Sequence, residues 1–162
     1  GIGLSTVSVG RLQILGDDLS ILSQNYDKTI LDIGAGLSNA AKVLTGMSGT
    51  AVMLCTDEPR SVIDSYSLIK LFAGRYPRTA LKIVINQSNT INDGLRTYAM
   101  LERACREFLK ISPPLLGIIR QDTRVRDSIR SQNTIISRYP QSEAALDIMA
   151  IAERILKNES CN

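Results

Sequence analysis

Four apolar runs of strand length recur along the chain, and longer segments with helical periodicity separate them. The runs lie at 29–34, 50–56, 81–87 and 114–120. Each is nearly continuous in apolar residues, which is typical of strands that are buried on both faces, and intervening helices favour parallel pairing of such strands. The sequence therefore predicts an α/β fold in which a mostly parallel sheet is covered by helices on both faces.

The segments between the runs carry apolar residues at helical spacing. Helices are predicted over 61–74, 93–110, about 122–132 and 142–157. Ser61 and Asp64 form a capping pattern at the start of the first helix, and Asp122 or Thr123 is expected to cap the third. The positions expected to face inward are Ile63, Tyr66, Ile69, Phe72, Leu95, Tyr98, Leu101, Cys105, Phe108, Ala145, Ile148, Ile151, Ala152 and Ile155. Nearer the amino terminus, we expect a strand at Leu4–Val9 or Leu12–Leu15 and a helix over Asp17–Gln24.

Size and composition are those of an ordinary globular protein. The 162 residues, 44% hydrophobic and 22% charged, are enough for one domain with a real core, so a single α/β domain over 1–162 is predicted. The net charge of +3 is too small to predict nucleic acid or anionic lipid as a partner. No apolar run has the roughly 18 residues that a membrane-spanning helix needs. The amino-terminal residues GIGLSTVSVG lack the pattern of a signal peptide, so a cytoplasmic location is expected.

Cysteine and histidine usage excludes several kinds of chemistry. The three cysteines, Cys55, Cys105 and Cys161, are far apart and lack CxxC spacing, which indicates thiols of a reducing compartment rather than a metal or disulfide scaffold. No histidine is present, which rules out Ser-His-Asp and Cys-His nucleophiles and histidine-ligated metals within these residues. Any catalysis must rest on carboxylates, amides, Lys, Arg and the backbone.

Polar residues follow each apolar run on its carboxyl side. They are Asp32, then Thr56-Asp57-Glu58, then Asn86-Gln87, and finally Arg120-Gln121-Asp122. The carboxyl ends of parallel strands lie along one edge of a sheet, where α/β proteins bind ligands, so these side chains are expected to converge. Chains also leave strands through polar turns without any function, and each position is open to that interpretation.

Three of these features suggest specific chemistry, and each also has a structural interpretation. Asp32 precedes Gly34-Ala35-Gly36, so it is either a turn residue or a carboxylate that holds Mg²⁺ through water beside a terminal phosphate. Asn86 carries the donor and acceptor needed to read an adenine edge, or it begins a turn. The arginines between Arg120 and Arg130 form a basic cluster that is either a solvated face or a surface for phosphate or DNA.

Taken in order, several segments resemble one known family. YDKTILDIGAGLS, VMLCTDEPRSVIDSYSLIKLF, KIVINQ and PLLGIIRQDTRVRDSIRSQNTIISRYPQSEAALDIMAIAERI are similar to the MinD/ParA class of P-loop ATPases. Within it they most resemble the FlhG/FleN branch of MinD-like flagellar-number and division-site regulators. The resemblance runs from about Tyr26 to Leu156, and the combination of D-x-G-A-G, T-x-E-P-x-S-x-x-D and V-x-N carries it.

The resemblance implies a role for each matching position. Asp32 would be the catalytic Walker B acid near Mg²⁺, and Gly34 and Gly36 would belong to the switch that senses the γ-phosphate. Asn86 would read adenine, and the loop that contains Arg120 and Asp122 would close over the base. Glu58 and Pro59 would have a structural role or lie near a dimer interface. Such proteins bind ATP and Mg²⁺ between two subunits, hydrolyse ATP slowly, and use that cycle to control localisation and protein partners.

The chain departs from the family pattern in two places. The KGGxGK[ST] loop is absent, so no phosphate cradle and no phosphate-binding lysine are present, and hydrolysis by these residues alone is not expected. Arg120 also stands where many relatives have proline. We expect either the carboxy-terminal part of a longer ATPase domain, without its first β-α unit, or a relative that has lost nucleotide chemistry.

Three functions follow as hypotheses. The first is a MinD/ParA-like ATPase that dimerises with ATP and regulates flagellar number or placement, the division site or partitioning, with or without peripheral association with the inner membrane. The second is a non-catalytic scaffold of the same fold that binds a protein partner. The third is nonspecific DNA binding through Arg120, Arg124, Arg126 and Arg130.

Overall fold

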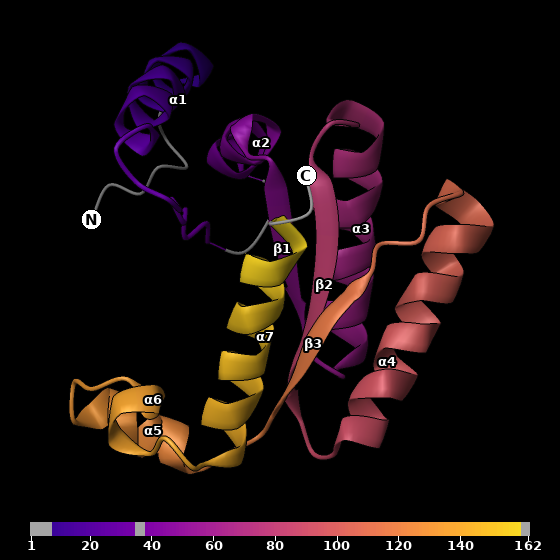
Figure 1. Cartoon of the computed structure of the whole chain (residues 1–162). Coiled ribbons are helices and arrows are strands. Elements are labelled where there is room, and N and C mark those ends of the chain that lie inside the picture. Colours follow the sequence, from indigo (N-terminus) through magenta and orange to yellow (C-terminus); the bar gives the residue numbers. More distant parts are fainter. Residues whose placement is uncertain (1–7, 35–37, 160–162) are drawn as a thin grey trace. The chain divides into compact units, whose positions relative to one another are not determined.

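The computed structural model describes residues 8–34 and 38–159, in which helices alternate with the strands of one sheet (Figure 1). The elements are α1 (Val9–Ser23), α2 (Asn39–Met47), β1 (Thr50–Cys55), α3 (Pro59–Arg75), β2 (Ala80–Ser88), α4 (Ile91–Ala104), the π-helical turn η2 (Cys105–Leu109), β3 (Leu115–Arg120), α5 (Arg124–Arg130), α6 (Ile135–Arg138) and α7 (Glu143–Glu159). The described residues form two compact units, one from 8–34, 38–51 and 67–80 and the other from 52–66 and 81–159.

The sheet has the strand order β1-β2-β3, and its strands are parallel. In β2 the consecutive residues Ile83, Val84 and Ile85 are all buried. Because neighbouring residues of a strand point to opposite faces, this strand is covered on both sides, as parallel strands require. The predicted strands at 50–56, 81–87 and 114–120 are therefore confirmed.

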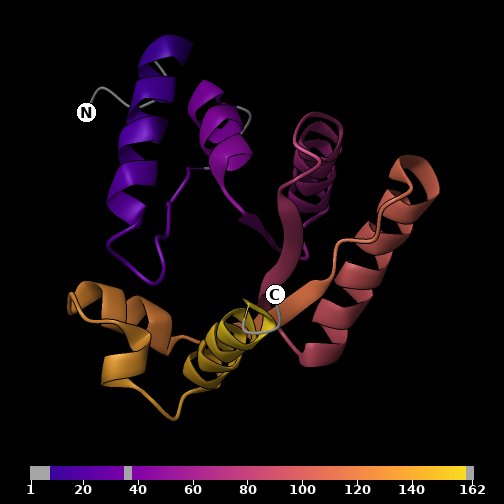
Figure 2. The same ribbon diagram turned by 45° about the horizontal axis from the view of Figure 1, so that its top comes forward.

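Helices α4 and α7 cover opposite faces of β3 in the second unit (Figures 1 and 2). A Cβ on Gly117 would lie 2.3 Å from Cγ1 of Ile151 on α7, and a Cβ on Gly94 of α4 would lie 2.6 Å from Cγ2 of Ile118. Gly117 and Ile118 are adjacent in the strand and so face opposite ways. The two glycines let both helices approach β3 closely, and the expected helices on both faces are confirmed.

The first unit is built mainly from α1, α2 and the second half of α3. Its buried residues include Leu12 of α1 and Ala40, Ala41 and Leu44 of α2. The Thr79 hydroxyl lies 3.2 Å from the carbonyl oxygen of Thr45 and 3.1 Å from that of Ser48. These hydrogen bonds connect the end of α2 to the turn that follows α3.

Two strand predictions near the amino terminus are wrong. Residues 29–34 have no regular secondary structure, and the side chain of Ile30 is 90% exposed. A strand needs a neighbour that shares its ladder of hydrogen bonds, and no described segment pairs with this one. Residues 12–15 are helical because Leu12, Leu15 and Leu19 repeat at the helical period within α1. The helix expected over 17–24 is the second half of α1, which ends one residue earlier, at Ser23. The alternative strand at 4–9 lies largely outside the described residues.

Most inward positions were predicted correctly, but Phe108, Ile63, Leu95 and Ala152 are exposed. Phe108 is 73% exposed because the π-helical turn η2 inserts an extra residue and so rotates the last turn of this helix. Helix α3 does bury Ile69 and Phe72, which were also predicted to face inward and lie in its second half. The short helix α2 and the single turn α6 were not predicted.

Candidate functional site at the ends of β2 and β3

The carboxyl ends of β2 and β3 lie side by side in the second unit. The Gln121 amide donates to the Ser88 carbonyl oxygen at 2.8 Å, and Ser88 pairs in register with Arg120. Gln87 has φ of 59°, and its amide donates to Oδ1 of Asn86 at 3.0 Å. The convergence expected of Asn86 and Arg120 is thus present in the backbone of these two strands.

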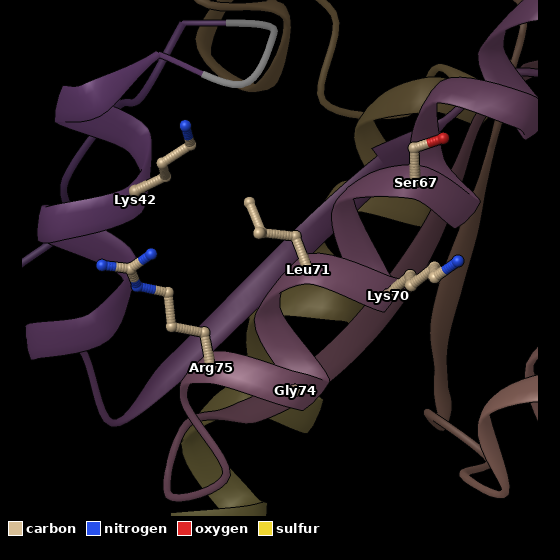
Figure 3. A pocket seen from close by; sticks show the side chains of 6 residues that line it. All are labelled: Lys42, Ser67, Lys70, Leu71, Gly74 and Arg75. Atoms are coloured by element: carbon tan, nitrogen blue, oxygen red, sulfur yellow. The ribbon is translucent and has the colours of Figure 1, made fainter.

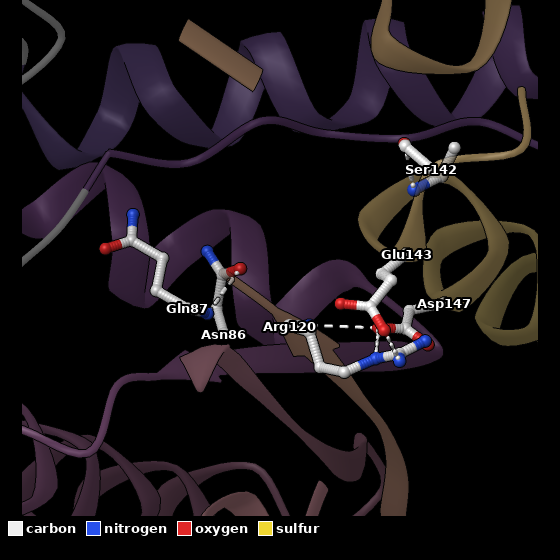
Figure 4. A network of polar contacts seen from close by, with 7 residues as sticks. Asn86, Gln87, Arg120, Ser142, Glu143 and Asp147 are labelled. Carbon is white, nitrogen blue, oxygen red and sulfur yellow. Dashed lines mark hydrogen bonds and ion pairs between the residues drawn. The ribbon is translucent and has the colours of Figure 1, made fainter. Parts of the chain in front are cut away.

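Arg120 extends from β3 toward the first turns of α7 (Figure 4). Its Nε and Nη2 donate to the two carboxylate oxygens of Asp147, each at 2.9 Å, and its backbone amide donates to Asp147 at 3.0 Å. Its Nη1 donates to Glu143 at 2.5 Å. A bidentate pair of this kind is strong and directional. Arg120 therefore ties the end of β3 to α7.

The charge around Arg120 is negative overall. One guanidinium faces the two carboxylates of Asp147 and Glu143, and the hydrogen bond to Asp147 raises the pKa of Arg120 above its usual value. Both acids lie near the amino end of α7, which the helix dipole favours. The Ser142 hydroxyl caps the same end by accepting from the Ala145 amide at 3.2 Å. Direct binding of a nucleotide phosphate by Arg120 would require it to leave these partners, and this role stays a prediction.

Asn86 keeps capacity for a ligand. Its side chain is half-buried and uses one lone pair of Oδ1 for the turn. Among the described residues, no protein group accepts a hydrogen bond from its Nδ2. A planar amide with a remaining donor and acceptor fits a purine edge. The adenine-reading role is compatible with this geometry and stays a prediction.

The other predicted site residues are distributed over both units. Asp122 is half-buried and accepts the Arg124 amide at 2.9 Å, so it stabilises the turn before α5. Asp32 and Gly34 are exposed residues of the first unit, and Gly36 lies outside the described residues. No cluster of three or more acidic, cysteine or histidine side chains suited to a metal occurs in the part of the chain that the structure describes.

The turn after β1 is held by Ser61. Its hydroxyl accepts the Thr56 amide at 2.9 Å and lies 3.8 Å from the sulfur of Cys55. Helix α3 begins at Pro59, whose fixed φ suits the first helical position. Ser61 therefore fixes the T-x-E-P turn to the end of the strand rather than capping the helix as predicted.

The basic cluster divides into separate parts. Arg124, Arg126 and Arg130 are exposed on α5, whereas Arg120 is held by the acids of α7.

Asp127 of α5 accepts hydrogen bonds from the Tyr139 hydroxyl and from Nε of Arg138, and both bonds lower the pKa of its carboxyl.

Comparison with known proteins gives both a sequence and a structural match. The antiactivator FleN of Pseudomonas aeruginosa is 26% identical over 146 residues, which is 90% of this chain and 51% of that protein. The cell-division ATPase MinD of Pyrococcus furiosus superposes with a TM-score of 0.73 at 18% identity, over 90% of this chain and 58% of that chain. The resemblance to the MinD/ParA family is confirmed. No family model matches the chain.

Other MinD structures agree on the fold. MinD of Aquifex aeolicus in a MinC:MinD complex gives a TM-score of 0.70 at 18% identity, over 90% of this chain and 59% of that chain. MinD of Pyrococcus horikoshii, complexed with Mg-ADP, gives 0.70 at 16% identity, over 89% of this chain and 56% of that chain. The chain spans about half the length of the curated relative that it matches, the antiactivator FleN. None of the helices in its described part combines the length and apolar character needed to cross a bilayer.

The sequence did not reveal the acidic partners of Arg120. Glu143 and Asp147 are spaced by four residues at the start of a helix, which places them on one side of it. That spacing was a usable signal, but it could not identify which cation they face.

Proposed function

We propose that the protein carrying this chain is a MinD/ParA-like regulator that binds Mg·ATP, dimerises in the ATP state and controls the placement or number of a cellular structure through a protein partner. The observation that carries the proposal is the match to the antiactivator FleN of Pseudomonas aeruginosa over 90% of the chain. The MinD fold over a similar share supports it.

The available side chains support a nucleotide on one side of such a site. Asn86 would read the base at the end of β2, and the segment after β3 would close over it. Asp32 would hold Mg²⁺ through water. The chain lacks a KGGxGK[ST] loop, so the groups that cradle the phosphates would come from elsewhere in the intact protein.

The decisive experiment is Mg·ATP binding and turnover by the intact protein, compared with Asp32→Ala and Asn86→Ala. We expect Asp32→Ala to abolish ATP turnover. We expect Asn86→Ala to weaken the binding of ATP but not the binding of a triphosphate that lacks the base. Asp64→Ala is a matched control, since its ion pair with Arg60 at 3.9 Å is exposed. Absence of ATP binding by the intact protein would refute the proposal.

A non-catalytic scaffold is the second candidate. The observation in its favour is that Arg120 and Asp122 already make internal contacts. It predicts that a protein partner binds equally with and without ATP, and equally to wild type and Asp32→Ala. ATP-dependent partner binding excludes this candidate.

A further inference from the structure

An open groove with a volume of about 650 Å³ lies between α2 and the second half of α3 in the first unit (Figure 3). Lys42 of α2 and Ser67, Lys70, Leu71, Gly74 and Arg75 of α3 line it. None of these residues is among those predicted to bind nucleotide. A ligand of this groove would therefore contact a different set of side chains.

The positive charge of the groove is not balanced locally. Its lining holds three cations and no carboxylate, and neither α2 nor residues 67–80 contain Asp or Glu. In the portion of the chain that the structure describes, Lys42, Lys70 and Arg75 form no ion pair. The Arg75 guanidinium lies 5.9 Å from the centroid of the Tyr76 ring, a cation–π contact that leaves its hydrogen-bond donors available.

The walls of the groove are fixed against each other. A Cβ on Gly46 would lie 2.4 Å from the Tyr76 ring, so α2 packs closely on the turn after α3. The buried Thr79 hydroxyl reaches the end of α2, and the Ala80 amide donates to the Gly49 carbonyl oxygen at 2.9 Å. A groove between two tethered helices is largely formed before a ligand arrives, which reduces the entropy cost of binding.

The lining is amphipathic. In Figure 3 the side chains of Lys42 and Arg75 extend into the space between the helices, and Leu71 lies between them. Lys70 points away from α2 and forms part of the rim. At Gly74 a Cβ would meet nothing within 4 Å, so the groove is open there.

We propose that this groove docks an acidic amphipathic helix of a protein partner. An apolar side chain of that helix would pack on Leu71, and carboxylates on either side would pair with Lys42 and Arg75. A groove with an apolar floor between two helices suits a peptide helix. A free phosphate would leave Leu71 unused, and the complementary charge would speed association and select acidic partners.

The test measures binding of a fluorescent synthetic peptide to the intact protein by anisotropy. The peptide is an amphipathic helix of about four turns, with Leu at helical spacing and Glu on both flanks. We expect saturable binding that weakens as salt is raised, and no binding of the same peptide with Lys in place of Glu. Adding ATP leaves the affinity unchanged, because the groove shares no residue with the nucleotide site.

Two variants block the groove in different ways. The double variant Lys42→Glu, Arg75→Glu reverses the charge and should weaken binding by at least about tenfold. Gly74→Leu fills the open end without a clash and should weaken binding to a similar extent while the protein stays folded by circular dichroism. The matched control is Arg124→Glu with Arg126→Glu, which makes the same change in net charge on α5 and should alter the affinity less than about twofold.

Several results would overturn the proposal. One is equal weakening by the α5 control, which would show that only net charge matters. Another is that Gly74→Leu binds the peptide as tightly as wild type does. A third is that tripolyphosphate or duplex DNA displaces the labelled peptide at the same concentration as the unlabelled peptide does. Failure of the intact protein to bind ATP leaves this inference standing, because peptide binding does not use the nucleotide residues.

Discussion

The substitution Gly117→Ala tests the closest approach in the second unit. A Cβ at this position would lie 2.3 Å from Cγ1 and 2.7 Å from Cδ1 of Ile151, but 3.7 Å from its Cβ. The first two separations are far inside van der Waals contact, so Ile151 must leave its rotamer or α7 must move from the sheet. Overpacking of this kind costs about 2 kcal/mol in the free energy of unfolding.

Ile151 is 9% exposed and packs with Val84 and Leu116, so Ile151→Ala alone should cost about 3 kcal/mol by leaving a cavity. In the double variant the clashing atoms are gone, and only the ordinary contact at 3.7 Å remains. The double variant should therefore be no less stable than Ile151→Ala, which gives a coupling energy of about 2 kcal/mol between the two sites. Urea unfolding of the wild type, Gly117→Ala, Ile151→Ala and the double variant measures this coupling energy. Strictly additive losses would refute the close packing of α7 on Gly117.

Three further predictions concern stability. Gly94→Ala should lower the free energy of unfolding by about 1–2 kcal/mol, because its Cβ would lie 2.6 Å from the side chain of Ile118 on β3. Gly74→Ala should raise the free energy of unfolding by up to about 1 kcal/mol, because a Cβ there meets nothing within 4 Å and Ala favours a helix more than Gly does. Thermal melting of both variants checks these opposite signs. Asp147→Ala should cost about 2 kcal/mol by removing the bidentate partner of the half-buried Arg120 and leaving it only the exposed Glu143 among its described acidic partners, and adding Arg120→Ala should recover part of that loss, as chemical denaturation can measure. The pKa of Asp127 is lowered by a tyrosine hydroxyl and a guanidinium, so its contribution is complete above its usual value of 3.8 and is lost as the pH falls through its folded value. Wild type minus Asp127→Asn should therefore show a stability difference that shrinks on acidification below pH 3.8, and a constant difference would contradict this.

Much of the second unit could be predicted from the sequence. The runs that became β1, β2 and β3 are short, apolar and flanked by helical periodicity, so local pattern and burial agree on their structure. The run at 29–34 has the same pattern but lacks a partner strand among the described residues, and its hydrogen-bonding groups cannot form a ladder. Phe108 was misplaced because no sequence signal marked the π-helical turn at 105–109.

The location of the candidate site could be predicted from the sequence, but the ion pairs within it could not. Strand ends identified Asn86 and Arg120 as neighbours, because parallel strands bring their carboxyl ends together. The acids that engage Arg120 come from 143 and 147, more than twenty residues further along the chain. A local sequence pattern cannot indicate a contact between residues so far apart along the chain. The groove beside Lys42 also escaped detection, because its residues belong to two helices and only one of these helices was predicted.

The amino-acid sequence by itself determined the fold class, the strands of the sheet and the resemblance to MinD-like regulators, because these depend on local patterns of burial and on ordered motifs. Tertiary structure decided which charges are paired. Arg120 is neutralised by α7 while Lys42 and Arg75 face an open groove without a carboxylate. Pairing depends on which side chains the packed helices bring within a few ångströms of each other, and that distance is set by the fold rather than by spacing along the chain.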